Sequence, residues 1–294
     1  MAKIIVRMKG GLGNQLFSYA AARRLALVNN AELVIDDVTG FARDCRYSRQ
    51  YMLGRFSIPV RKATPAEQLW PFERCRRGVM KYLSRRKQFE KRSYLEQEGI
   101  DFDARLLNAA VKGTLYLDGL WQSENYFKDV EETIRKDLRI KPPADVLNQR
   151  TFEEIRKNLA VALHVRWFDM SENGMTDNLS SDYYQRAIAL MEDKVKLPHY
   201  FVFSDNPEAA RAKLTLPKGR VTYVFHNKGD ENAYADLWLM TKCRYFITAN
   251  STFGWWGAWL AEEKEKIVIT PGELRGRTTA WGFKGHIPSS WLQL

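Results

Sequence analysis

The residues best suited to binding chemistry lie in one stretch, YFITANSTFGWWGAW, which begins at Tyr245. Residues 245–248 are apolar and partly β-branched, which predicts a buried strand. The turn at residues 249–252 carries side-chain oxygens that can cap a helix. Apolar residues then recur at helical spacing, at Phe253, Trp256 and Leu260. A strand that passes through a small polar turn into a helix points backbone N–H groups at one spot, which can hold a phosphate. Taken alone, the turn is explained more simply as an ordinary helix N-cap.

Polar side chains also follow the ends of the other strands predicted in the second half of the chain. Ligands of parallel α/β sheets bind beyond the carboxyl ends of the strands. The residues that follow the four strands are 164–169, 204–206, 226–228 and 250–252. Arg166 can hold a phosphate bidentately and cannot lose its charge, and His164 faces the same side of the extended segment. A core histidine and a salt bridge from Arg166 to Asp169 are the simpler alternatives, but four suitable strand ends together favour a nucleotide site.

A glycine-rich loop opens the chain. Residues 3–8 form a predicted strand, the loop runs from Gly10 to Gln15, and a helix and a second strand at residues 31–35 follow. The loop lacks the third glycine of a dinucleotide-binding fingerprint. Glycines suit any tight turn between a strand and a helix, but the amides of Asn14 and Gln15 can reach a ligand as well as cap the helix.

The composition predicts a globular protein that binds an anionic partner. The chain has 294 residues, which is long enough for two domains with their own cores. It is 45% hydrophobic and 28% charged, as is typical of globular proteins. The net charge of +11 favours nucleic acid, an acidic membrane surface or a phosphorylated substrate. No apolar run approaches the roughly 20 residues that span a bilayer, and no secretory segment precedes the first strand. The three cysteines are far apart, so we expect reduced thiols in a cytoplasmic protein.

Strands and helices alternate on both sides of Lys141-Pro142-Pro143. The two prolines after a helix predict a linker between domains. This alternation predicts two parallel-sheet α/β domains, residues 1–142 and 143–294. Further strands are predicted at 114–117, 160–163, 200–203, 221–225 and 267–269, and helices at 144–158 and 234–242. A helical segment is also expected after Gln122, up to about Leu138.

The segment from Arg74 to Arg92 contains nine basic residues. A solvated or mobile basic helix is the preferred interpretation. The alternative is docking onto an anionic membrane face, which such a cluster favours.

These residues carry a resemblance to a known family. The blocks GGLGNQLFSYAAAR, GLWQSENYF, LHVRWFD, FVFSDNPEAA and YADLWLMTKCRYFITANSTFGWWGAWL follow one another from Gly10 to Leu260. In this order they are similar to the bacterial α-1,2-fucosyltransferases of glycosyltransferase family 11. The resemblance implies a GT-B fold, in which two Rossmann-like domains face each other across a cleft. The N-terminal domain would carry the acceptor side and the C-terminal domain the GDP-sugar, and a return of the last helix to the N-terminal domain is left open.

The resemblance also implies the reaction: inverting transfer of L-fucose from GDP-β-L-fucose to the 2-hydroxyl of a galactoside, in a glycan, O-antigen or capsule. Neither a metal nor a cofactor is expected. Arg166 would bind the β-phosphate, Asp236 the guanine, and the Gly13-Asn14 loop would close over the phosphate and fucose. The full expected donor site is Gly11, Gly13, Asn14, His164, Arg166, Ser204, Asp205, Asp236, Asn250, Ser251 and Thr252, with Arg166 and Asp169 catalytic.

One block departs from the family pattern HVRRGDY. Here it reads HVRWFDM, with Trp167 in place of the second arginine and Phe168 in place of the glycine. We expect activity to survive, because Arg166 and Asp169 remain. The general base stays open among Asp169, Asp37 and Glu124, and Asp169 is better suited to orienting Arg166.

Three rival functions are weighed against this one. Transfer of another sugar from GDP or UDP would keep the fold. Nucleic-acid binding would explain the charge, but no nucleic-acid motif is present and the polar turns follow strands, so no nucleic-acid partner is expected. A carbohydrate-binding module would explain the nine tryptophans, but Trp256 belongs to an apolar helical face. The expected location is the cytoplasm, with possible contact at the inner membrane face through residues 74–92 on the way to a lipid-linked acceptor.

Overall fold

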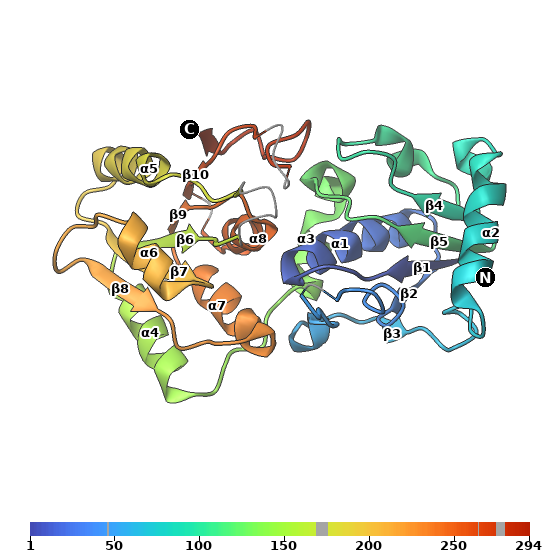
Figure 1. The fold of residues 1–294 in the computed structure, drawn as a ribbon, viewed down its shortest axis with the longest axis horizontal. Coiled ribbons are helices and arrows are strands. Elements are labelled where there is room, and N and C mark those ends of the chain that lie inside the picture. Colours follow the sequence, from blue (N-terminus) through green and yellow to red (C-terminus); the bar gives the residue numbers. More distant parts are fainter. Residues whose placement is uncertain (46, 169–175, 264, 275–279) are drawn as a thin grey trace. The chain divides into compact units, whose positions relative to one another are not determined.

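The computed structural model describes residues 1–45, 47–168, 176–263, 265–274 and 280–294. The chain divides into two compact units (Figure 1). Unit 1 comprises Met1–Arg139 with Lys284–His286, and unit 2 comprises Ile140–Phe283 with Ile287–Leu294. Each unit is built on one parallel sheet, so the predicted pair of parallel-sheet α/β domains is confirmed.

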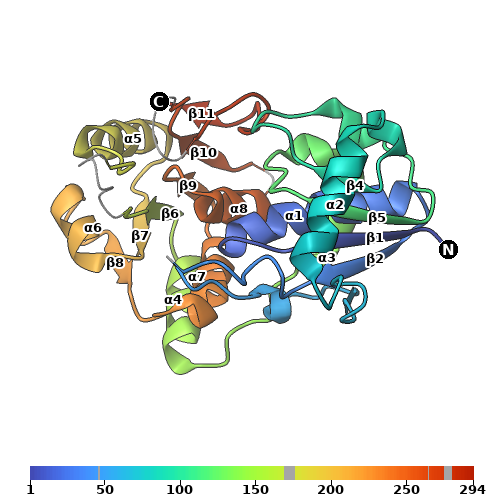
Figure 2. The same ribbon diagram turned by 45° about the vertical axis from the view of Figure 1, so that its right-hand side comes forward.

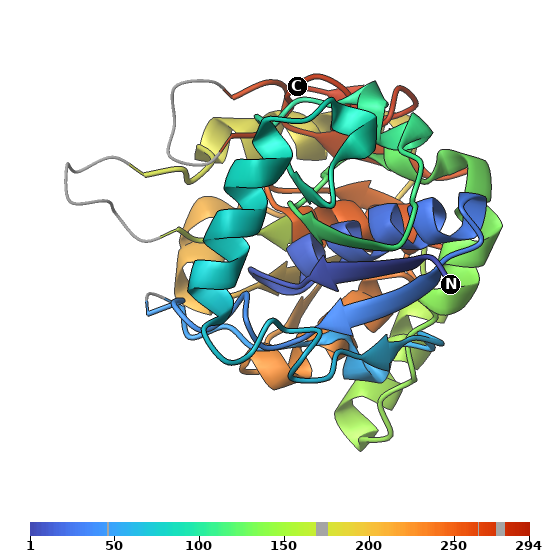
Figure 3. The ribbon, with the colours of Figure 1, turned by 90° about the vertical axis from the view of Figure 1, so that its right-hand side faces the viewer.

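Unit 1 has a five-stranded sheet in the order β3-β2-β1-β5-β4, with every pairing parallel. The strands are β1 (Lys3–Arg7), β2 (Glu32–Asp36), β3 (Arg61–Lys62), β4 (Tyr94–Glu96) and β5 (Thr114–Asp118). The helices are α1 (Leu12–Val28), α2 (Glu73–Arg85) and α3 (Glu131–Asp137), and α2 lies on the outside of the unit (Figure 3). Short 3-10 turns lie at Leu53–Arg55, Phe89–Lys91, Ala104–Asn108, Glu124–Tyr126 and Lys128–Val130.

Unit 2 has a six-stranded parallel sheet in the order β11-β10-β9-β6-β7-β8. The strands are β6 (Ala160–Val165), β7 (His199–Ser204), β8 (Val221–Val224), β9 (Tyr245–Ile247), β10 (Ile267–Thr270) and β11 (Leu292–Gln293). The helices are α4 (Val146–Arg156), α5 (Ser181–Lys194), α6 (Pro207–Lys213), α7 (Ala233–Met240) and α8 (Thr252–Leu260), and a 3-10 turn lies at Asp230–Asn232 (Figure 2).

Burial explains why the sequence folds this way. All six residues of β6 are buried, as expected for a central strand of a parallel sheet that is covered on both faces. In unit 2, Trp255, Trp256 and Trp259 pack against one another, and Trp255 also contacts Trp291. These tryptophans are core residues, as predicted for Trp256, rather than a sugar-stacking surface.

Several elements lie outside the sequence prediction. No strand was expected at β3 or β4, and no helix at α5 or α6. The helical segment expected up to Leu138 consists of two 3-10 turns followed by α3, which begins only at Glu131. The part of the C-terminal chain that joins unit 1 is Lys284–His286, whereas the last described helix, α8, belongs to unit 2.

No helix in the described part of the chain is long and apolar enough to cross a membrane. Cys45, Cys75 and Cys243 are all free thiols, as predicted, with the first two exposed and the third buried.

Candidate functional site

Strand order places a binding position in unit 2 between β6 and β9. From β6 the chain continues to β7 and β8 on one side, and β9 and β10 then fill the other side. Leu163 of β6 pairs with Ile247 of β9, so their carboxyl ends are neighbours. Ligands of open α/β sheets bind at this kind of topological switch point. The predicted residues Arg166 and Ser251 follow these two strands and therefore belong to the same edge of the sheet.

Arg166 is held by a carboxylate from the next strand end. Its Nη1 forms an ion pair with Asp205 Oδ2, and the backbone N–H of Trp167 donates to Asp205 Oδ1 at 2.9 Å. The Arg166 side chain is 23% exposed, so the guanidinium is fixed by Asp205 and still partly accessible. Asp169, the partner considered from the sequence, lies outside the described residues. Asp205 therefore fixes the Arg166 guanidinium and the Trp167 backbone at this edge of the sheet.

Helix α8 begins at the same edge. Ser251 is its N-cap, and its hydroxyl accepts from the backbone N–H of Phe253 at 3.3 Å. The ordinary capping interpretation is therefore correct for Ser251. The first turn of α8, which starts at the partly exposed Thr252, carries no acidic side chain, so the positive end of the helix dipole is not neutralised from within. A cap of this kind and an anion-binding helix end are compatible.

His164 and Asn250 are buried beside this helix end. Burial and the nearby Arg166 charge lower the pKa of His164 to about 3, so the imidazole is neutral. Its Nδ1 has no hydrogen-bond partner among the described residues and lies 2.7 Å from where a Cβ on Gly254 would stand. His164 thus fills space against α8 and cannot provide a cation. Asn250 donates to the carbonyl of Asp177 at 2.9 Å, which ties the turn to the chain ahead of α5.

Ser204 supports the neighbouring turn. Its hydroxyl donates to the carbonyl of Asn206 and accepts from the Asn206 N–H, both at 3.1 Å. Asn206 in turn caps α6 through the N–H of Ala209. The hydroxyl of Ser204 is thereby engaged by its own turn.

Asp236 sits in a network of amides that the sequence did not reveal. Asn227 Nδ2 donates to Asp236 Oδ1 at 2.8 Å, and the side chains of Asn227 and Asn148 exchange two hydrogen bonds of 2.8 Å. His226 contacts Asn148 at 3.1 Å. Burial raises the pKa of Asp236 to about 7, and the Asn227 bond only partly offsets it. Asn148 gave no sequence signal, because a polar residue in an exposed-looking helix is ordinary.

Trp167 and Phe168, the two residues that depart from the family pattern, each have a cation close to the ring. The ammonium of Lys213 lies 5.5 Å from the Trp167 ring, and the Arg166 guanidinium lies 5.2 Å from the Phe168 ring. Asn178 pins Phe168 by accepting from its N–H at 2.7 Å and donating to its carbonyl at 2.9 Å. Where the family pattern has a second arginine, this chain thus has an indole ring with the ammonium of Lys213 beside it.

In unit 1 the glycine loop also lies at a switch point, between β1 and β5. Gly10 has a φ of +72°, which favours glycine, and Gly11 is the N-cap of α1, whose first turn includes Gly13. Gln122 Nε2 donates to Asn14 Oδ1 at 2.8 Å. Gln15 is buried and bonded to the backbone of Gly10, Gln50 and Met52, so it stabilises the loop instead of reaching a ligand.

A buried charge cluster at the same sheet edge was not anticipated. Asp118, at the end of β5, pairs with Lys9 at 2.8 Å and Arg7 at 3.1 Å and accepts from the Tyr94 hydroxyl at 2.7 Å. Lys81 of α2 lies 3.6 Å away. Burial alone would raise the pKa of Asp118, but Lys9, Tyr94 and Arg7 outweigh it and hold the pKa well below its usual range.

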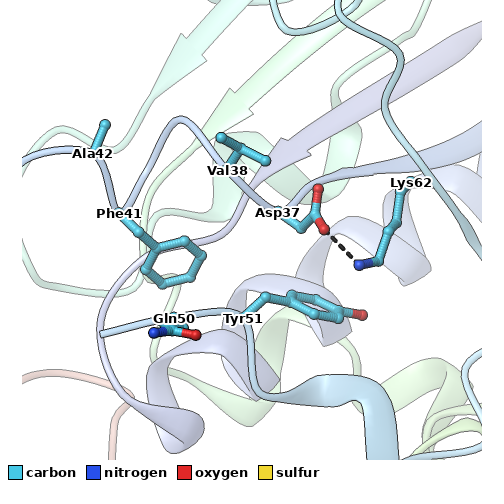
Figure 4. Close-up of a pocket in the computed structure, with 7 residues that line it drawn as sticks. All are labelled: Asp37, Val38, Phe41, Ala42, Gln50, Tyr51 and Lys62. Carbon is cyan, nitrogen blue, oxygen red and sulfur yellow. Dashed lines mark ion pairs between the residues drawn. The ribbon is translucent and has the colours of Figure 1, made fainter. Parts of the chain in front are cut away.

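A cavity of about 440 Å³ opens in unit 1 just after β2 (Figure 4). Its lining residues are Asp37, Val38, Phe41, Ala42, Gln50, Tyr51 and Lys62. Asp37 pairs with Lys62 at 2.6 Å, and the Lys62 ammonium lies 4.9 Å from the Tyr51 ring. Burial and the charge of Asp37 raise the pKa of Tyr51 to about 12. Aromatic side chains with a few polar groups are a lining typical of small-molecule pockets.

The structure describes two of the three candidate bases. Asp37 lines the cavity. Glu124 lies in a 3-10 turn, with its carboxylate 3.8 Å from Lys128. Asp169 lies outside the described residues. Among the described residues, no group of three or more His, Cys, Asp and Glu side chains is arranged to hold a metal ion.

Curated relatives cover nearly the whole chain. An α-1,2-colitosyltransferase of Escherichia coli is 27% identical over 304 residues, which cover 100% of this chain and 99% of the relative. The O-antigen biosynthesis glycosyltransferase WbnK of Escherichia coli is 28% identical over 289 residues, or 90% and 92% of the two chains. A galactoside α-(1,2)-fucosyltransferase 1 of Ateles belzebuth is 24% identical over 266 residues, or 86% and 63%.

Solved structures share the fold. A mutant of FUT1 from Arabidopsis thaliana in complex with GDP has a TM-score of 0.56 at 16% identity, over 95% of this chain and 71% of that chain. The NodZ α-1,6-fucosyltransferase soaked with GDP-fucose has a TM-score of 0.50 at 16% identity, over 88% and 92%. The predicted GT-B fold class, with two Rossmann-like domains, agrees with these neighbours.

The family model described as Glycosyl transferase family 11 matches residues 3–275, which include both switch points, Arg166 and the α8 turn. The chain therefore belongs to glycosyl transferase family 11 and is a glycosyltransferase.

Proposed function

We propose that this protein transfers L-fucose from GDP-β-L-fucose to the 2-hydroxyl of a galactoside, with inversion at the sugar carbon and without a metal ion. The observation that carries the proposal is that Arg166 and the N-terminus of α8 both follow the neighbouring strands β6 and β9 at the switch point. Two relatives support the α-1,2 linkage. One is named an α-1,2-colitosyltransferase and the other a galactoside α-(1,2)-fucosyltransferase 1. Solved neighbours contain GDP or GDP-fucose, which supports the guanine nucleotide.

The leaving group sets the chemical demand. As the acceptor oxygen attacks the sugar carbon from the face opposite GDP, the bond to the β-phosphate oxygen breaks and negative charge builds on the diphosphate. Fixed positive charge and N–H donors at that point lower the barrier. In the proposal, the Arg166 guanidinium and the first turn of α8 supply both, while Asp205 keeps the guanidinium in place.

Asp236 is proposed to read the guanine. An ionised carboxylate accepts two hydrogen bonds, which matches the N1–H and 2-amino donors of guanine. Adenine presents no such pair of donors. The buried amides Asn227 and Asn148 hold the Asp236 side chain in one orientation.

This role predicts a pH-dependent affinity for GDP. Because the pKa of Asp236 is raised to about 7, protonation competes with guanine binding as the pH falls below that value. The dissociation constant of GDP, measured by calorimetry, should rise roughly fivefold to tenfold from pH 7 to pH 6. Asp236→Asn should weaken GDP binding about a hundredfold and remove the pH dependence, while Asp182→Asn, an exposed control on α5, should change neither. Retention of the pH dependence in Asp236→Asn would assign it to another group, such as His226.

The acceptor galactoside is proposed to bind in the cavity beside β2, with Asp37 as the general base. The carboxylate would take the proton of the 2-hydroxyl as the new bond forms, and Phe41 and Tyr51 would pack against the sugar ring.

Asp37→Asn should therefore lower kcat by about a hundredfold or more, because a positioned base contributes roughly 10²–10⁴-fold. GDP binding should stay unchanged. Tyr51→Ala should instead raise KM for the acceptor with a smaller effect on kcat. The measurement is steady-state kinetics with lactose. If Asp37→Asn changes KM alone, Asp37 binds the acceptor and the base lies elsewhere.

Colitose is the second candidate for the transferred sugar. The relative that covers the whole chain is named a colitosyltransferase. Colitose is fucose without the 3-hydroxyl, so a site that hydrogen-bonds this hydroxyl would reject colitose, and an apolar site would accept it. The ratio of kcat/KM for GDP-fucose and GDP-colitose with one acceptor decides between them.

The direct test is detection of product by mass spectrometry after incubation with GDP-fucose, lactose and related galactosides, in the presence of a chelator. Linkage and anomeric configuration follow from NMR of the product. Hydrolysis or transfer only with another nucleotide sugar would overturn the assigned donor.

We further propose that the protein acts in the cytoplasm at the inner face of the membrane, on a free or lipid-linked galactose-terminated glycan.

A further inference from the structure

Helix α2 of unit 1 is amphipathic in the reverse of the usual sense. Its inward face is polar: Arg77 donates to Thr39 at 2.8 Å, and Lys81 pairs with Glu96 at 2.5 Å. Ser84 accepts from the backbone N–H of Tyr94 at 3.1 Å. The only buried residues of the helix are Arg77 and Ser84. Charge pairing, and not apolar packing, therefore attaches this helix to the domain.

The apolar residues of α2 and of the turn before it are exposed. We call this set the apolar stripe: Trp70 (64% exposed), Phe72 (75%), Val79 (57%), Tyr82 (56%) and Leu83 (50%). Val79, Tyr82 and Leu83 are spaced by three and four residues and so share one face of the helix. Helix α2 lies on the outside of unit 1 (Figure 3). A helix that turns Arg77 and Ser84 to the domain and exposes its apolar residues has a further surface to contact.

Cations surround the stripe. Arg74, Arg76, Arg86, Lys87 and Lys91 are exposed, and none forms an ion pair with a described residue. The Arg86 guanidinium lies 4.1 Å from the centre of the Tyr82 ring, so it covers the aromatic face and presents its charge at the edge of the stripe. Arg77 and Lys81, which have carboxylate partners, point inward, whereas Arg85 is exposed and pairs with Glu96 at 2.8 Å.

We propose that the apolar stripe of α2, with its five surrounding cations, docks the protein onto an anionic lipid bilayer. The axis of α2 then lies parallel to the membrane plane. Exposed tryptophan, tyrosine and phenylalanine next to arginine and lysine suit the headgroup region, where one end of each ring meets hydrocarbon and the other meets water. The cations are attracted to anionic headgroups, and the apolar residues add burial that salt does not screen.

A second copy of the chain fits this surface less well. Two copies meeting through α2 would bring together two sets of the same unpaired cations, which repel each other. An anionic bilayer offers both the opposite charge and an apolar interior. The inference goes beyond the proposed transfer reaction and does not depend on it, because no residue of the stripe belongs to the candidate site.

The exposed cysteines permit a site-specific test in the full chain. In a Cys45→Ser background, an environment-sensitive fluorophore on Cys75 reports from α2, one turn before Val79. In a Cys75→Ser background, the same fluorophore on Cys45 is the matched control on an exposed loop. With phosphatidylcholine vesicles that contain phosphatidylglycerol, we expect blue-shifted, stronger emission at Cys75 and no change at Cys45. Pure phosphatidylcholine should give little change at either position.

Vesicle flotation with variants then separates the two components. Phe72→Ser with Leu83→Ser should lower the partition coefficient about tenfold or more, and the remaining binding should disappear in high salt. Arg74→Glu with Arg76→Glu should lower it by a similar factor. Val146→Ser with Leu147→Ser, which changes exposed apolar residues of α4, should have no effect. All variants should keep wild-type turnover with soluble lactose, which distinguishes this proposal from the transferase assignment.

Three results would overturn the proposal. The first is an absence of binding to phosphatidylglycerol vesicles. The second is binding with unchanged emission at Cys75, which would place the contact elsewhere. The third is a dimer, detected by light scattering without lipid, that the Phe72→Ser with Leu83→Ser variant abolishes.

Discussion

Replacing Arg166 with alanine should reduce kcat by about a hundredfold to a thousandfold while leaving the protein folded. The expected loss matches that of a single donor in a preorganised site that stabilises a developing anion. The structure supports this size of effect, because Asp205 fixes the guanidinium and Arg166 is still 23% exposed. Steady-state kinetics with GDP-fucose and lactose, together with the thermal unfolding midpoint, provide the measurement.

Two further variants make this result interpretable. Arg166→Lys keeps the charge but loses the two-pronged geometry, so it should recover only part of the activity. Arg186→Ala removes an exposed arginine that also pairs with an aspartate, Asp182, at 3.0 Å, and it should be silent. If Arg166→Ala retained normal turnover, the phosphate assignment would be wrong even if fucose transfer were correct.

Replacing Asp118 with alanine should destabilise unit 1 by about 3–5 kcal/mol, which is the usual cost of removing one partner from a buried ion pair. The carboxylate is 2% exposed, and its removal leaves Arg7 and Lys9 at the sheet edge without their common counter-charge. Urea unfolding monitored by circular dichroism measures the loss. The exposed Asp129, which pairs with Arg24 at 2.7 Å, provides the matched control, and Asp129→Ala should cost no more than about 1 kcal/mol.

The pH dependence of the free energy of unfolding provides a second test of the role of Asp118. Because the pKa of Asp118 is lowered in the folded state, its contribution is fully present above the ordinary value of 3.8 and is lost as the pH falls below it. The stability difference between the wild type and Asp118→Asn should therefore shrink under acid conditions. A difference that persists unchanged into acid would show that shape, and not charge, is what Asp118 contributes.

The exposed cations of α2 and the charge cluster at Asp118 have a common physical origin. The sequence shows nine basic residues between Arg74 and Arg92 but not which of them have partners. In the fold, Arg77 and Lys81 turn inward to Asp36, Glu96 and Asp118, which lie at the ends of three different strands. Their partners are distant in sequence, so only the sheet order brings them together. Arg74, Arg76, Arg86, Lys87 and Lys91 stay exposed and form no ion pair with a described residue, whereas the exposed Arg85 pairs with Glu96.

The sequence alone identified the central strands, the glycine loop and the strand-turn-helix at Tyr245, because their apolar periodicity and turn residues act within a few positions of each other. It also predicted the two α/β domains and pointed to Arg166. It did not reveal short edge strands such as β3, whose two residues are both charged. The pairing of Arg166 with Asp205, the amides around Asp236 and the cavity beside Asp37 were decided only by the tertiary structure. Each of these joins residues from separate strands or loops, and such contacts are set by strand order and packing, which leave no local pattern along the chain.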